Sequence, residues 1–90
     1  MSNLEAARET IDRIDNEMAA LFEARMNAVK KIAEYKKEHG LPVRDPAREE
    51  ALIARCLEKI GDPEVKAHYL LFLRGVIDAS CAYQESLIRT

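Results

Sequence analysis

The sequence predicts an all-α protein: a three-helix chain with a very long first helix. Apolar residues recur at alternating spacings of three and four, and no stretch alternates with the period of two that strands show. Glycines and prolines number only three each, and five of these six lie within residues 40–46 and 61–63, where they separate three helical stretches. With 48% apolar and 33% charged residues, the composition is that of a globular helical chain rather than a disordered one.

The first helix is predicted from residue 2 or 3 to about His39. Ser2 and Glu5 have the spacing of a capping box, in which each side chain serves a free backbone N–H of the first turn. Gly40 supplies a residue that can adopt the left-handed conformation of a helix stop, and Pro42 prevents continuation.

The second helix is predicted from Asp45, an N-cap followed by Pro46 at the first helical position, to about Ile60. Gly61 is expected to end it. Its predicted inward residues, besides Ile60, are Leu52, Ile53, Cys56 and Leu57.

The third helix is predicted to begin at Asp62 and Pro63 and to continue nearly to Thr90. These two residues repeat the pattern of an N-cap followed by proline that begins the second helix. Its inward stripe contains two polar residues, Ser80 and Gln84, four apart and therefore on one face. The apolar members of the stripe are Val65, Tyr69, Phe72, Leu73, Val76, Ile77, Leu87 and Ile88.

The length of the first helix predicts an intertwined homodimeric bundle. A helix from Leu4 to His39 is roughly 54 Å long at ~1.5 Å per residue, whereas a compact domain of this size is only ~30 Å across. The two shorter helices cannot cover it, so a second copy is expected to pack its first helix antiparallel. A helix broken near its middle is the alternative, although no glycine or proline interrupts it. The expected seam is Leu4, Ala7, Ile11, Ile14, Met18, Leu21, Arg25, Ala28, Ile32 and Tyr35.

Arg25 stands in this seam where packing favours an apolar side chain. Removing a guanidinium from water costs roughly several kcal/mol unless an anion or hydrogen-bond partners compensate for the lost hydration. Either a fixed carboxylate lies opposite Arg25, or the position is built for an anionic ligand. Lys36 follows three turns later and points in nearly the same direction, although a solvated lysine that complements the helix dipole explains it equally.

Further polar residues fit the same hypothesis. Arg44 precedes the second helix, and Arg48 and Glu49 lie in its first turn, where backbone N–H groups bind anions. Taken singly, Arg48 could be a surface arginine and Gln84 a self-satisfied buried amide. Together, cations, an amide and one carboxylate suit a small polyanion that also carries a hydroxyl, and a chemistry of electrostatic stabilisation. We find no nucleophile paired with a base, no metal-ligand cluster and no glycine-rich phosphate loop.

The composition limits the partners and the compartment. A net charge of −2 gives no long-range attraction for nucleic acid or anionic lipid. We expect a single domain over residues 1–90, no membrane span, and cytoplasmic localisation, because the charged opening MSNLEAARET lacks the apolar run of a signal peptide. Cys56 and Cys81 have no metal-ligand spacing and are expected to be reduced core side chains.

The pattern resembles the all-helical class of chorismate mutase, found in bacterial bifunctional enzymes of phenylalanine and tyrosine synthesis. The resemblance covers essentially the whole chain, and its most specific stretch is PVRDPAREEALI at 42–53. EAARETIDRID, LFEARMNAVKKIAEYK and IDASCAYQESLI also match the family's functional segments. The eight matching positions are Arg8, Arg25, Lys36, Asp45, Arg48, Glu49, Ser80 and Gln84.

The resemblance implies an intertwined homodimer in which each active site takes Arg8 from the neighbouring chain. It also implies an isomerase that converts chorismate to prephenate in the shikimate pathway of aromatic amino acid biosynthesis, without a cofactor or covalent intermediate. Lys36 and Gln84 would donate to the ether oxygen that gains charge, and Glu49 with the Asp45 backbone N–H would hold the ring hydroxyl. The remaining implied roles concern the two substrate carboxylates, bound by Arg8, Arg25 and Arg48 with support from Ser80.

Two alternatives stay open at this point. Isochorismate pyruvate lyase has the same fold and a similar set of cations and glutamine, although PVRD followed by Arg48 and Glu49 favours the mutase. A non-catalytic helical interaction module is the other, but it leaves Arg25, Ser80 and Gln84 unexplained.

Overall fold

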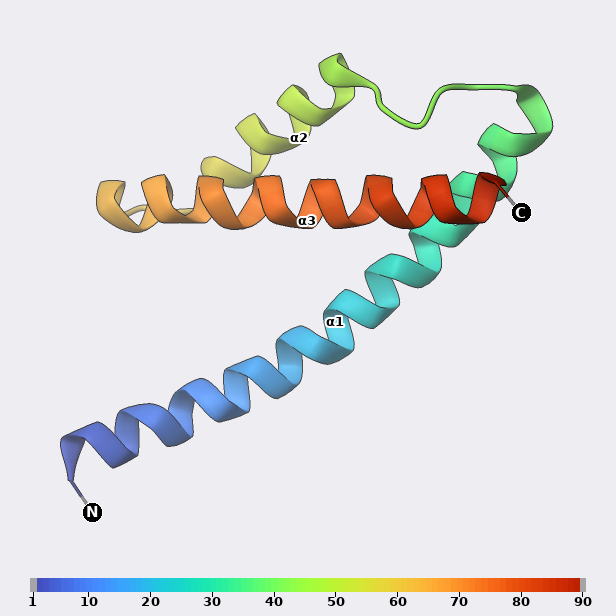
Figure 1. Ribbon diagram of the computed structural model, residues 1–90. Coiled ribbons are helices and arrows are strands. Elements are labelled where there is room, and N and C mark those ends of the chain that lie inside the picture. Colours follow the sequence, from blue (N-terminus) through green and yellow to red (C-terminus); the bar gives the residue numbers. More distant parts are fainter. Residues whose placement is uncertain (1, 90) are drawn as a thin grey trace.

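The computed structural model describes residues 2–89 and contains three helices (Figure 1). These are α1 (Asn3–His39), α2 (Pro46–Leu57) and α3 (Pro63–Arg89). No strand occurs within the described residues. The predicted all-α class and very long first helix are confirmed, whereas the predicted extension toward Thr90 passes outside the described residues.

The helix ends lie where the capping residues predicted them. The Ser2 hydroxyl accepts a hydrogen bond from the Glu5 backbone N–H at 3.1 Å. Gly40 adopts the left-handed conformation (φ 63°, ψ 31°), and its N–H bonds back to the carbonyl of Lys36. At α2, the Asp45 side chain accepts a hydrogen bond from the backbone N–H three residues further on, at 3.2 Å. The two ends of α1 and the start of α2 thus each have a local chemical cause.

The prediction for the end of α2 was wrong by three residues, because the helix ends at Leu57 rather than Ile60. Beyond Leu57 the hydrogen bonds shorten to i−3 partners: the Lys59 N–H bonds the Cys56 carbonyl and the Ile60 N–H bonds the Leu57 carbonyl, each at 3.1 Å. Such tightening satisfies the last carbonyls of a helix. Gly61, which we expected to act as the stop, does not have a positive φ.

Two helix–helix interfaces hold the chain together, and α3 takes part in both (Figure 1). On one side α2 packs on α3 around the buried side chains of Ile53, Ile77 and Cys81. On the other, the second half of α1 packs against α3 and buries Val29 and Ala33, the latter only 1% exposed. The small alanine side chain allows the two helices to approach closely.

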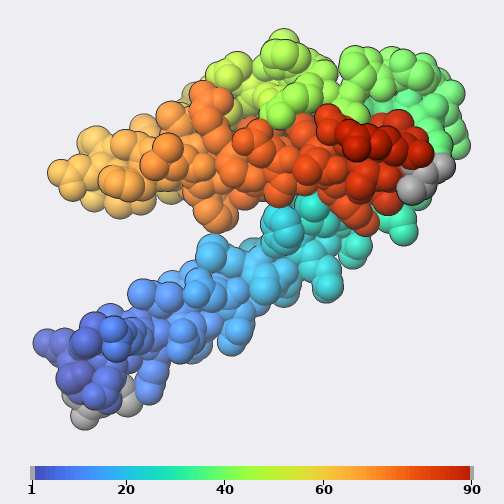
Figure 2. Space-filling view, viewed as in Figure 1, coloured from blue at the N-terminus to red at the C-terminus, as the bar shows by residue number. Residues whose placement is uncertain are grey.

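The first half of α1 has no cover within its own chain. It diverges from α3, and the space-filling view shows it standing apart (Figure 2). The chain measures 55 × 26 × 15 Å with a radius of gyration of 16.3 Å, well above the ~12 Å of a compact domain of this length. The exposed apolar side chains of this half are Leu4, Ile11, Ile14, Met18, Leu21 and Phe22.

The predicted seam is not the face that α1 buries inside its own chain. Ile32 and Tyr35, which the heptad-like spacing placed inward, are 47% and 57% exposed, while Val29 and Ala33 are buried. The helix therefore carries two apolar faces, one covered by α3 and one uncovered. None of the helices within residues 2–89 combines the length and the apolarity that crossing a bilayer requires.

Candidate functional site

A pocket of about 600 Å³ lies where the second half of α1, the connection at 41–45, the start of α2 and the second half of α3 meet. Polar and apolar side chains share its wall. The apolar part is formed mainly by Val29, Ile32, Leu41, Val43, Leu52, Ile77 and Cys81. Its polar part is Arg25, Lys36, Arg44, Asp45, Arg48, Glu49, Ser80 and Gln84.

Lys36 joins three parts of the chain at this pocket. It lies in the last turn of α1, and the left-handed turn at Gly40 folds the following connection back over it. Its Nζ donates to the backbone carbonyl of Val43 at 2.5 Å and to Oε1 of Gln84 at 2.9 Å. Gln84 is buried (6% exposed) on α3. Both partners of the ammonium are therefore neutral.

Arg25 has a neutral partner as well. Its Nη1 donates to the hydroxyl of Ser80, which in turn donates to the carbonyl of Val76 at 2.9 Å. Ser80 is only 5% exposed, as the stripe of α3 predicted. No carboxylate within residues 2–89 forms an ion pair with Arg25. The fixed carboxylate that was one of the two explanations for an arginine in the seam is therefore not found within this part of the chain.

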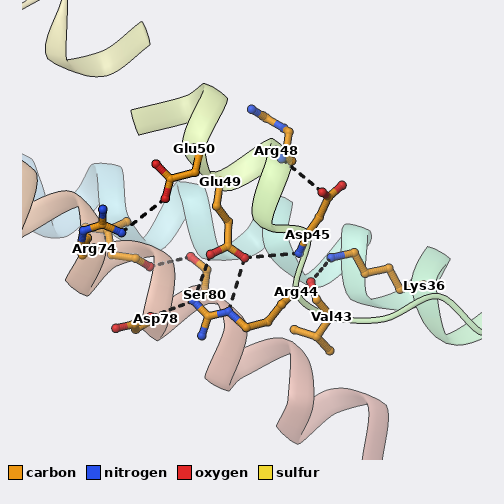
Figure 3. Close-up of polar contacts among 11 residues, drawn as sticks. Lys36, Val43, Arg44, Asp45, Arg48, Glu49, Glu50, Arg74, Asp78 and Ser80 are labelled. Atoms are coloured by element: carbon orange, nitrogen blue, oxygen red, sulfur yellow. Dashed lines mark hydrogen bonds and ion pairs between the residues drawn. The ribbon is translucent and has the colours of Figure 1, made fainter. Parts of the chain in front are cut away.

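Glu49, another residue of the pocket wall, is held by Arg44 (Figure 3). Its Oε1 accepts from Nη2 of Arg44 at 3.1 Å, and its Oε2 accepts from Nε of Arg44 at 3.4 Å and from the Asp45 backbone N–H at 3.3 Å. Arg44 Nη2 also donates to Asp78 Oδ1 at 2.9 Å. The hydrogen bond to Glu49, which has the larger effect, and the hydrogen bond to Asp78 raise the pKa of Arg44 above its ordinary value.

Sequence reasoning noted Arg44 only as a cation before the second helix, without connecting it to Glu49, and did not identify Asp78. An arginine five residues ahead of a first-turn glutamate was the available signal for Arg44. Nothing local could have indicated Asp78, because it comes from α3, 34 residues further along the chain.

The side chains of Arg48 and Arg8 have no hydrogen-bond or ion-pair partner within residues 2–89, although the backbone N–H of Arg48 donates to the Asp45 side chain. Arg48 lines the pocket, and Figure 3 shows its side chain extending away from the carboxylate of Glu49. Arg8 is exposed in the second turn of α1 and does not line the pocket of its own chain. The structure thus brings seven of the eight predicted site residues to one pocket and leaves Arg8 outside it.

The pocket has a positive balance inside a chain of net charge −2. Four arginine or lysine side chains and two carboxylates line it, which leaves a formal excess of two positive charges. Arg44 is the lining cation that forms ion pairs among the described residues. Burial raises the pKa of the Cys81 thiol, so this side chain contributes neutral surface to the wall.

Comparison with known proteins agrees with the chemistry of the pocket. Residues 7–85 match the protein family described as chorismate mutase type II. A similar protein is the T-protein of Haemophilus influenzae, 41% identical over 59 residues, which are 64% of this chain and 16% of that protein. The chorismate mutase of Methanocaldococcus jannaschii is 36% identical over 55 residues, 61% of this chain and 56% of that protein.

A third relative is the bifunctional chorismate mutase/prephenate dehydratase of Aquifex aeolicus, 37% identical over 57 residues, which are 63% of this chain and 16% of that protein. The chain therefore spans about half of one curated relative and a small part of the other two. The family match, in contrast, covers nearly all of the chain and includes every polar residue of the pocket. This chain belongs to the chorismate mutase type II family.

Proposed function

We propose that this chain converts chorismate to prephenate, as a step of aromatic amino acid biosynthesis. The observation that carries the proposal is a pocket in which Arg25, Lys36 and Arg48 have neutral partners or none. Chorismate is a dianion, and its rearrangement needs neither a nucleophile nor a covalent intermediate. Membership of the family supports the mutase over the isochorismate lyase and over a non-catalytic module.

Lys36 and Gln84 would stabilise the ether oxygen as its bond breaks. Because the Gln84 carbonyl accepts from Lys36, the amide NH₂ of Gln84 remains to donate to the substrate. Lys36 keeps its third donor after bonding Val43 and Gln84. Two donors fixed before the substrate arrives need little reorganisation in the transition state, which is the arrangement that lowers a barrier electrostatically.

The arginines would bind the two carboxylates and hold the flexible substrate in its compact reactive conformer. Arg25, oriented by the hydroxyl of Ser80, would take one carboxylate, and the unpaired Arg48 is available to another. Glu49, oriented in part by the Asp45 backbone N–H, would accept a hydrogen bond from the ring hydroxyl.

We also propose that the active form is an intertwined homodimer and that Arg8 of each chain completes the pocket of the other. The uncovered apolar half of α1 borders two clefts against α3, of about 420 and 520 Å³, which have predominantly apolar walls. Exposed apolar surface on this scale is typical of an interaction site. The cytoplasmic localisation stays a prediction.

Two substrates given in turn to the purified protein test the proposed reaction. We expect loss of the ultraviolet absorbance of chorismate at a rate proportional to protein concentration. We expect no fluorescent salicylate from isochorismate. Salicylate formation without chorismate loss would assign the lyase activity instead. If neither substrate is turned over, the non-catalytic interaction module is the remaining explanation.

A further inference from the structure

We propose that Arg44 is a positioning residue that fixes the Glu49 carboxylate in the orientation that receives the hydroxyl of the substrate, and that Asp78 anchors Arg44 from α3. The inference rests on the proposed mutase function. It assigns Arg44 a role different from that of the other cations in the pocket, because Arg44 acts through Glu49 and does not bind the substrate itself.

The first argument is the count of acceptor positions on Glu49. An ionised carboxylate offers about four lone-pair positions. Two are taken by the Nε and Nη2 of Arg44, at 3.4 and 3.1 Å, and one by the Asp45 N–H at 3.3 Å. These three donors fix both oxygens and leave a position to accept the proton of a hydroxyl. Without Arg44, only the single bond from Asp45 would orient the group.

The second argument is the charge state of Arg44. Its guanidinium is paired with two carboxylates, Glu49 and Asp78, at 3.1 and 2.9 Å. An arginine neutralised twice has little remaining attraction for a substrate carboxylate, unlike Arg25 and Arg48. The Asp78 contact also ties the connection at 41–45 to α3 and holds the guanidinium of Arg44 beside Glu49 (Figure 3).

The third argument is that stabilising the fold does not explain this arrangement. The side chains of Arg44 and Asp78 are 48% and 68% exposed, and ion pairs in such positions contribute little to folding. A neighbouring pair offers a comparison: Arg74 on α3 meets Glu50 on α2 at 3.7 Å, with exposures of 54% and 66%. Neither member of that pair lines the pocket, whereas Arg44 and Glu49 both do.

The test is a double-mutant cycle on the full chain with chorismate as substrate. We expect Arg44→Met to lower kcat/KM by about tenfold or more, as the loss of a charge-assisted hydrogen bond does. In a Glu49→Gln background the same substitution should change kcat/KM by less than about twofold, because Arg44 acts through the carboxylate. Arg74→Met, the matched control, should leave kcat/KM unchanged and alter the thermal midpoint as little as Arg44→Met does.

Arg44→Lys and Asp78→Asn sharpen the result. A lysine restores the charge without the fork, so we expect kcat/KM between those of the wild type and Arg44→Met. Asp78→Asn should lower kcat/KM in the wild-type background and have no effect with Glu49→Gln. If Arg44→Met does not fold, the Asp78→Asn cycle provides the same test.

Three results would overturn the inference. Equal effects of Arg44→Met with and without the Glu49 carboxylate would mean that Arg44 acts independently of Glu49. Equal loss of activity in Arg44→Met and Arg74→Met would mean that the ion pairs between elements are only structural. A wild-type chain without chorismate turnover would overturn the proposed function, and the inference with it, whereas additivity in an active enzyme overturns the inference alone.

Discussion

The positive side chains around the pocket differ in what holds them. Arg44 is neutralised by carboxylates, whereas Arg25 and Lys36 are oriented by a hydroxyl, a carbonyl and an amide. Neutral partners fix the direction of a cation without cancelling its charge. A site built in this way is preorganised for an anion and remains attractive to it.

Removing either of these two cations should therefore disable the reaction. We expect Lys36→Ala and Arg25→Ala each to lower kcat for chorismate at least about a hundredfold, because Lys36 would donate to the ether oxygen as it gains charge and Arg25 would hold the substrate in its reactive conformer. Lys37→Ala is the matched control, because Lys37 is exposed and lies outside the pocket. A turnover near that of the wild type in Lys36→Ala would remove it from the mechanism.

Gln84→Glu should shift the activity toward acid pH. An amide donates at any pH, but a carboxyl donates only when protonated, and free glutamate titrates near ~4.3. An ionised group at this position would also pair with Lys36, which now lies 2.9 Å from the Gln84 oxygen. The rate of chorismate loss between neutral and acid pH measures the shift. An unchanged profile would show that Gln84 does not contact the ether oxygen.

Much of the site could be predicted at this scale because its residues violate a packing pattern. Arg25 interrupts the seam of the first helix, and Ser80 and Gln84 interrupt the stripe of the third, where they are indeed buried. Arg8 gives no such signal, since a polar residue on an exposed turn is ordinary. Asp78 could not be found either, because its contact with Arg44 depends on how two distant segments pack.

Among the elements, the turn that ends α1 brings the connection at 41–45 back to the pocket. Gly40 allows the chain to leave the helix in a left-handed conformation, after which Val43 returns to the ammonium of Lys36. The caps of α1 and the start of α2 were predictable because each depends on one local residue type. The end of α2 was not, because Gly61 has no positive φ and the tightened hydrogen bonds at 58–60 have no distinctive residue pattern.

Gly40→Ala should therefore lower the free energy of unfolding by about 1 kcal/mol, because an alanine in the left-handed region is strained. Gly61→Ala is the control: a Cβ at either position meets no atom within 4 Å, but only Gly40 has a positive φ. Urea unfolding at equal protein concentrations compares them. Equal losses in both variants would contradict the role of the turn.

The shape of the whole chain separates Arg8 from the pocket. The pocket lies at one end of α1 and Arg8 near the other, on a helix of 37 residues. A single chain therefore cannot place Arg8 in its own pocket. The predicted seam begins in the same half of the helix, where its large apolar residues from Leu4 to Leu21 are exposed in the single chain. This arrangement is expected if a second copy covers the seam and brings its Arg8 to the pocket.

Mixing two inactive variants tests this exchange. We expect Arg8→Ala and Arg25→Ala, mixed equally and allowed to exchange subunits, to recover about a quarter of the wild-type activity, because half of the dimers would be mixed and each would hold one intact site. Arg25→Ala mixed with Lys36→Ala should recover nothing, since both residues belong to the pocket of one chain. Recovery in neither mixture would place Arg8 outside the active site.

The most direct measurement is a calorimetric titration of the protein with a bicyclic dianion that mimics the chair-like transition state. We predict one binding site per chain, weakened at least about a hundredfold in Arg25→Ala, since a donor to the transition state has this effect. Absence of binding, or equal affinity in the wild type and Arg25→Ala, would contradict the claim that the cations of this pocket bind a doubly negative ligand.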